Sequence, residues 1–67
     1  MIQVTLNGQP EVLDDGITVL ALLERRQLAG KRLAVERNGE IVPKARHGET
    51  ALAEGDRLEI VVAVGGG

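Results

Sequence analysis

The 67-residue sequence contains no cysteine and no phenylalanine, tyrosine or tryptophan. Without cysteine, the chain can form neither disulfides nor thiolate metal sites, and it offers no thiol nucleophile. Without aromatic rings, it has no platform on which a base, a sugar or a flavin could stack. Hydrophobic residues still make up 43% of the chain. The core must therefore be built from aliphatic side chains.

A strong excess of charge is also missing. Ten acidic and eight basic residues are interspersed and give a net charge of −2. There is no basic stripe of the kind that predicts nucleic-acid binding. No apolar run approaches the ~18 residues of a membrane span, and no signal peptide is visible after Met1. We therefore expect one small cytoplasmic domain of modest stability, with no nucleic-acid or membrane partner.

The first segment predicts a β-hairpin. Apolar and polar residues alternate in IQVTL, and Asn7-Gly8 has the chemistry of a tight hairpin turn. The returning strand contains Pro10, which cannot donate a hydrogen bond to a neighbour, so we expect it at a sheet edge. A strict two-residue turn would set Val4 opposite Glu11. We therefore expect a bulge or a slightly longer loop.

A helix is expected next, with Thr18 as its N-cap and a wide leucine-rich face. Gly30 lies where a helix commonly ends in left-handed geometry. Arg25 and Arg26 are interpreted as a solvated helix end, and Asp14-Asp15 as turn and helix-start residues rather than a pair of catalytic carboxylates.

The second half predicts another hairpin, an irregular polar segment and a last strand. A two-residue turn at Asn38-Gly39 places Val35 opposite Val42 and Glu36 opposite Ile41. In the irregular segment, Leu52 is expected to contact the core. The final strand alternates, so one face carries Leu58, Ile60, Val62 and Val64, and the other carries Glu59, Val61 and Ala63.

This order of elements predicts an α+β fold with a four- to five-stranded mixed sheet and one main helix across one face. A last strand that pairs parallel to the first gives the β-grasp, or ubiquitin-like, arrangement. We expect the domain to span residues 1–64 and residues 65–67 to form a flexible glycine tail.

No catalytic constellation is visible in the sequence. His47 is the only histidine, and its polar surroundings predict exposure to solvent rather than acid–base chemistry. The terminal Gly65-Gly66-Gly67 is more unusual. Glycine allows a backbone to enter a channel too narrow for any Cβ, and the α-carboxylate of Gly67 is ionised at neutral pH. An enzyme that holds ATP could let this carboxylate attack the α-phosphate.

The sequence resembles the ThiS family of sulfur carrier proteins from thiamin biosynthesis over essentially its whole length. The matching segments are IxVxLNG, DGITVxxLL, AVERNGEIVPK, LxEGDRLEIV and the AVGGG end. The resemblance implies a β-grasp fold. It also implies that the Gly67 carboxylate is adenylated by a ThiF-type enzyme using ATP and Mg²⁺, with Gly65 and Gly66 as the tail and no cofactor or metal bound by this chain.

The resemblance further implies that the adenylate becomes a thiocarboxylate, with sulfur from a cysteine desulfurase or another donor, and that thiazole synthase receives the sulfur. On this reading the chain is a protein co-substrate and not an enzyme. We expect partners to contact the outward-facing Val61, Ala63 and Ile41, together with Val64 at the junction with the tail. Two alternatives stay open: a carrier like the small subunit of molybdopterin synthase, and a ubiquitin-like binding module without carrier chemistry.

Overall fold

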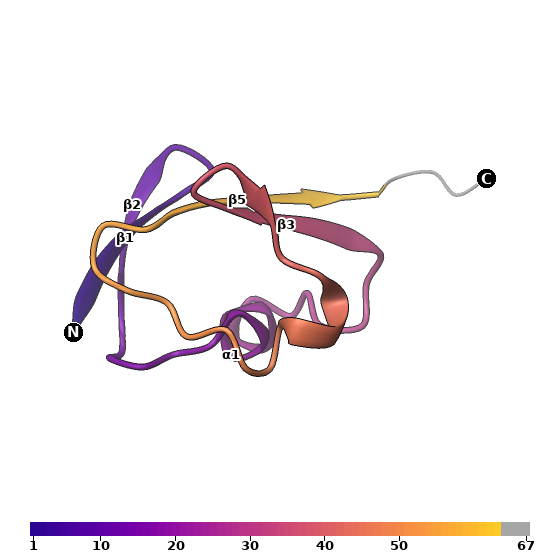
Figure 1. The fold of residues 1–67 in the computed structure, drawn as a ribbon, viewed down its shortest axis with the longest axis horizontal. Helices are drawn as coiled ribbons and strands as arrows, with labels where there is room; N and C mark the ends of the chain where they lie inside the picture. The colour runs from indigo at the N-terminus through magenta and orange to yellow at the C-terminus, as the bar shows by residue number, and fades with distance from the viewer. Residues whose placement is uncertain (64–67) are drawn as a thin grey trace.

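A computed structural model describes residues 1–63 of the chain. These residues form a five-stranded mixed sheet in the order β2-β1-β5-β3-β4, with helix α1 across one face (Figure 1). The elements are β1 (Ile2–Leu6), β2 (Gln9–Leu13), α1 (Val19–Arg25), β3 (Leu33–Arg37), β4 (Glu40–Ile41), the 3₁₀ turn η1 (Lys44–Arg46) and β5 (Arg57–Val62). The predicted α+β architecture with a single main helix is confirmed.

The last strand, β5, lies at the centre of the sheet. It pairs parallel to β1, as the sequence predicted, and antiparallel to β3. The strand β2, which contains Pro10, lies at one edge. In the β3–β4 hairpin, Glu36 pairs with Ile41 and the Val42 amide donates to the Val35 carbonyl, so the register predicted from Asn38-Gly39 is confirmed.

The expected bulge in the first hairpin is wrong. Val4 lies directly opposite Glu11, across a two-residue turn in which Asn7 and Gly8 both have positive φ. The register is tolerated because the Glu11 side chain reaches the surface, where it forms an ion pair with Arg26. The helix end is therefore not simply solvated, and Arg25 likewise pairs with Asp14.

The helix begins as predicted and ends earlier than predicted. The Thr18 hydroxyl accepts a hydrogen bond from the Ala21 amide at 3.1 Å, which satisfies a free N–H of the first turn. The left-handed residue at the helix end is Gln27 (φ 59°), and the Leu28 amide closes the turn on the Leu23 carbonyl. Gly30 has a positive φ but lies beyond this cap, because the Schellman-type closure brings Leu28 back against the core.

The core is entirely aliphatic and lies between the sheet and α1 (Figure 1). Leu52 belongs to it, as expected. Its buried members are Val4, Leu6, Leu13, Ile17, Val19, Leu22, Leu23, Val35, Leu52, Leu58 and Ile60.

The expected exposure of His47 is wrong. His47 is only 7% exposed, and its Nε2 lies 3.1 Å from the Val42 carbonyl oxygen. The segment that follows β4 packs beneath the helix, where the His47 carbonyl accepts a hydrogen bond from the Leu20 amide. Polar neighbours in sequence misled the prediction, because this burial comes from tertiary packing and not from local pattern.

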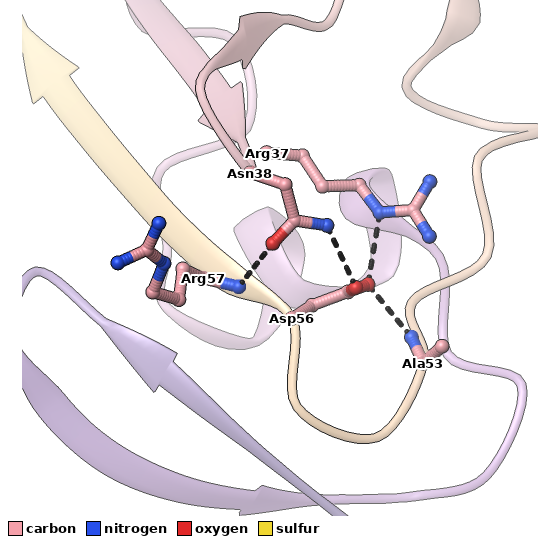
Figure 2. A network of polar contacts seen from close by, with 5 residues as sticks. All are labelled: Arg37, Asn38, Ala53, Asp56 and Arg57. Atoms are coloured by element: carbon pink, nitrogen blue, oxygen red, sulfur yellow. Dashed lines mark hydrogen bonds and ion pairs between the residues drawn. The ribbon is translucent and has the colours of Figure 1, made fainter.

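A buried carboxylate, Asp56, joins the start of β5 to the β3–β4 hairpin (Figure 2). One of its oxygens accepts from Arg37 Nε and from the Ala53 amide, both at 2.8 Å, and the other accepts from Asn38 Nδ2 at 3.0 Å. Asn38 in turn accepts from the Arg57 amide at 2.9 Å. The network places only donors around the acceptor-only carboxylate, and no buried side-chain nitrogen or oxygen within residues 1–63 lacks a hydrogen-bond partner.

Two opposing effects set the pKa of Asp56. Burial favours the neutral acid and raises the pKa, but hydrogen bonds from Asn38, Ala53 and Arg37, together with the charge of Arg37, favour the carboxylate. The second set prevails, and the pKa of Asp56 lies below its ordinary value of 3.8. A lowered folded-state pKa means that Asp56 stabilises the fold above its unfolded pKa, and that this contribution is lost as the pH falls through the folded-state value.

We expect Asp56→Asn to lower the free energy of unfolding at pH 7 by about 2–3 kcal/mol. The amide nitrogen of the asparagine would face N–H donors of the network, from which it cannot accept a hydrogen bond. The melting temperature should fall by roughly 10–20 °C. Below the ordinary pKa of 3.8 the gap from the parent should begin to narrow, because the unfolded parent binds a proton there first and the folded parent follows at lower pH. Thermal unfolding between pH 2 and 7 measures this. The exposed, paired Asp14→Asn is the matched control and should show a much smaller loss. Equal melting temperatures for Asp56→Asn and the parent at pH 7 would contradict the assignment.

Candidate functional site

The C-terminal half of β5 extends beyond its neighbour β1. The register with β1 covers only Arg57 and Leu58. Past that point the Asn7 side chain substitutes for a strand: its Oδ1 accepts from the Ile60 amide at 2.8 Å, and its Nδ2 donates to the Ile60 carbonyl at 3.3 Å. The register with β3 continues to Val62, and the Ala63 amide donates to the Arg32 carbonyl at 2.9 Å. The end of β5 is therefore held mainly from the β3 side.

This arrangement carries the end of β5 to the side of the molecule opposite the N-terminus (Figure 1). The predicted tail residues Gly65, Gly66 and Gly67, and the predicted contact residue Val64, lie outside the described residues. What the structure describes is the domain surface from which they continue.

That surface is the sheet face opposite α1, here called the open face. Val61 is 65% exposed on it, Ile41 is 59% exposed, and Ala63 is exposed. Val61 lies opposite Ala34 of β3, also exposed, so the two extend the aliphatic surface across the strand pair. The predicted outward placement of Ile41, Val61 and Ala63 is confirmed, and their contact with partners stays a prediction.

The inward stripe of β5 is shorter than predicted. Leu58 and Ile60 are buried, but Val62 is 37% exposed. The reason is its position at the end of the sheet, where its cross-strand neighbour Leu33 is itself only partly buried.

The open face also carries charge that the sequence reasoning did not single out. Glu36 and Glu59 are cross-strand partners, and with Arg57 they line a depression of about 390 Å³ bordered by Gly8 and Gly39 of the two hairpin turns. The signal was available in part, because the hairpin register that turns Ile41 outward also turns Glu36 outward.

A second hollow, of about 400 Å³, lies on the helical side between α1 and the segment after β4. Its lining is largely aliphatic, with Lys31 and Lys44 among the lining residues. His47 also lines it, but its Nε2 is already engaged by the Val42 carbonyl. We interpret this hollow as a consequence of a small core without aromatic rings to fill it.

Within residues 1–63, no group of three or more His, Asp or Glu side chains is arranged to hold a metal ion. Among the helices of this same part of the chain, none has the length and hydrophobicity to cross a membrane. The open face combines exposed aliphatic side chains with a charged depression lined by the first half of β5.

The sequence model of the ThiS family matches residues 3–67. The sulfur carrier protein ThiS of Bacillus subtilis is 48% identical over 50 residues, which are 75% of this chain and 76% of that protein. The crystal structure of the thiamine biosynthesis protein (ThiS) from Geobacter metallireducens superimposes with a TM-score of 0.82 at 30% identity, over 98% of this chain and all of that one.

Thiazole synthases from Paramagnetospirillum magneticum and Magnetococcus marinus are 42% and 37% identical over 65 residues. The chain spans only 20% of the length of these two relatives. The family model covers nearly the whole sequence, and the described residues have the fold of the Geobacter structure. The chain therefore belongs to the ThiS family.

Proposed function

We propose that this chain is a sulfur carrier protein of thiamin biosynthesis and that the α-carboxylate of Gly67 is the group that carries the sulfur. The observation that supports this most is the family match over residues 3–67, which joins the β-grasp domain and the glycine end in one pattern. The name of the Bacillus relative, a sulfur carrier protein, supports the same assignment. These relatives favour the thiamin branch over the molybdopterin alternative and over a plain binding module.

In this proposal the chemistry begins on a partner enzyme of the ThiF type, which holds ATP and Mg²⁺. A carboxylate oxygen of Gly67 attacks the α-phosphorus of ATP, and pyrophosphate leaves. A persulfide from a cysteine desulfurase, or sulfide from another donor, then attacks the acyl carbon and displaces AMP. Sulfide gives the thiocarboxylate directly, whereas a persulfide gives an acyl disulfide that a thiol cleaves to the thiocarboxylate and a second disulfide. The chain is a co-substrate in this sequence: it holds no cofactor of its own and presents its terminus to enzymes.

The domain contributes a docking face and a fixed exit direction. Val61 and Ala63 lie on the open face at the end of β5, beside the segment that continues to Val64 and the glycines. Three glycines span at most ~11 Å, so the domain must dock close to the partner's active site. An exposed aliphatic patch on so small a protein is suited to such docking.

Thiazole synthase is the proposed acceptor of the sulfur. Two relatives that bear this name contain a segment similar to 65 residues of this chain. A carrier-like segment and a thiazole synthase in one polypeptide would place sulfur delivery next to thiazole formation, which supports the same pairing for the present chain.

Mass spectrometry of the protein isolated from its host tests the proposal directly, because the C-terminal peptide should gain the mass difference between sulfur and oxygen.

Deleting Gly67, or adding one residue after it, should reduce ATP–pyrophosphate exchange on the partner enzyme by about 10²-fold or more. The reason is geometric: either change moves the carboxylate by up to about 3.3–3.6 Å, and in-line attack depends on placement. The exchange rate with purified ThiF-type enzyme is the measurement, and the melting temperature is the folding control. Unchanged exchange by the extended protein would rule out Gly67 as the reacting residue.

Val61→Asp should weaken binding to the adenylating enzyme by about 10-fold or more, because it puts a charge at the centre of an apolar contact. The fold should persist, since Val61 is 65% exposed. Val12→Asp is the matched control: Val12 is 63% exposed, but it lies on β2 at the sheet edge two strands away from β5. A binding titration and circular dichroism measure the two effects. Equal losses for both variants would contradict docking at β5.

Gly66→Val should block adenylation while leaving the melting temperature nearly unchanged. A β-branched side chain adds bulk and restricts φ and ψ, so the tail would no longer pass through a narrow channel. The measurement is the adenylation rate at saturating protein, together with thermal unfolding. Normal adenylation of this variant would show that the glycines serve some other purpose.

A further inference from the structure

The open face places two residues of like charge opposite each other, an arrangement expected to cost stability. Glu36 of β3 and Glu59 of β5 lie directly opposite each other in the antiparallel register, where side chains are about 4.5–5.5 Å apart at Cβ and like charges are destabilising. Glu36 is half-buried beside its neighbours, and Glu59 is exposed. Stability therefore does not explain why two glutamates occupy opposed positions on this sheet face.

Neither glutamate forms an ion pair within residues 1–63. The ion pairs found there join Asp14, Asp15, Glu11, Asp56 and Glu49 to other groups. Arg57 lines the same depression as the two glutamates, but it is in none of those pairs. Two carboxylates and one guanidinium leave the depression with a net negative charge.

Aliphatic side chains border the acidic pair. Ile41 of β4 is the cross-strand neighbour of Glu36. Val61 and Ala34 face each other two residues farther along β5 and β3, on the same face of the sheet. All three are exposed. This surface is complementary to a partner surface on which a positive side chain is surrounded by apolar side chains. When two such surfaces meet, the apolar contacts exclude water and strengthen the interaction between the charges.

We propose that the Glu36–Glu59 pair is a recognition element for an arginine on the surface of the partner protein that docks on the open face. A guanidinium presents donors in a planar fork and can donate to both carboxylates at once, which a point charge such as ammonium does less well. The partner side chain replaces the repulsion between the glutamates by two charge-assisted hydrogen bonds. This inference rests on the proposed function, since the partner is the adenylating enzyme.

The decisive variant is Glu59→Lys. It creates an opposite-charge pair with Glu36, so the melting temperature should rise by about 1–6 °C. The same change puts a cation where the partner's arginine would bind, so the concentration of protein that half-saturates ATP–pyrophosphate exchange should rise about 10-fold or more. A stability gain combined with a binding loss is the signature of a recognition element, because a merely structural residue would lose both together.

Glu24→Lys is the matched control. Glu24 is exposed on α1, on the layer opposite the open face, and the substitution changes net charge identically. The concentration of Glu24→Lys that half-saturates ATP–pyrophosphate exchange should stay within about twofold of the parent value. The double variant Glu36→Gln, Glu59→Gln should bind the adenylating enzyme more weakly although it introduces no cation. Its affinity should depend less steeply on salt concentration between 50 and 300 mM than that of the parent.

The outcomes separate the two proposals. If the parent chain itself does not support exchange, the proposed function fails and this inference fails with it. If the parent supports exchange but Glu59→Lys and Glu24→Lys behave alike, only the arginine-recognition inference is overturned. A fall in the melting temperature of Glu59→Lys would refute the repulsion on which it rests. Sedimentation showing a parent dimer that Glu59→Lys dissociates would assign the face to a second copy of this chain instead.

Discussion

The position of β5 depends on two asparagines and one aspartate. Asp56 joins the strand's start to the second hairpin through Arg37 and Asn38, and Asn7 holds Ile60 where β1 has ended. Each Asn-Gly turn thus has a second role, because the turn asparagine also bonds to the central strand. In a chain that buries little surface, these few side-chain hydrogen bonds supplement the β3–β5 ladder in holding the strand.

Much of this architecture could be predicted from local chemistry. Pro10 excluded β2 from the sheet interior, Thr18 identified the helix start, and the two-residue turn at Asn38-Gly39 determined which way Ile41 faces. In each case the information lies within a few residues. The same holds for the outward placement of Val61, which follows from alternation along β5.

The features that were missed depend on residues distant in sequence. Asn7 and Ile60 are 53 positions apart in the sequence, and Asp56 and Arg37 are 19 apart. No local sequence pattern predicts hydrogen bonds between residues so far apart. His47 became buried because the segment after β4 packs against the helix, and Gln27 took the left-handed position because that closure lets Leu28 reach the core. The Glu36–Glu59 pairing needed the β3–β5 register, which strand assignment alone does not supply.

The two faces of the sheet follow opposite rules, and this contrast is itself informative. Against α1, each cross-strand neighbour of β5 is apolar or neutralised, as with Val35 opposite Ile60 and Arg37 bonded to Asp56. On the open face, two carboxylates oppose each other and aliphatic side chains meet solvent. Stability alone would favour opposite charges where the two carboxylates face each other, and polar residues where the aliphatic side chains are exposed. A face that departs from both preferences fits the role proposed for it, a surface that docks on a partner, on a domain stabilised from its other side.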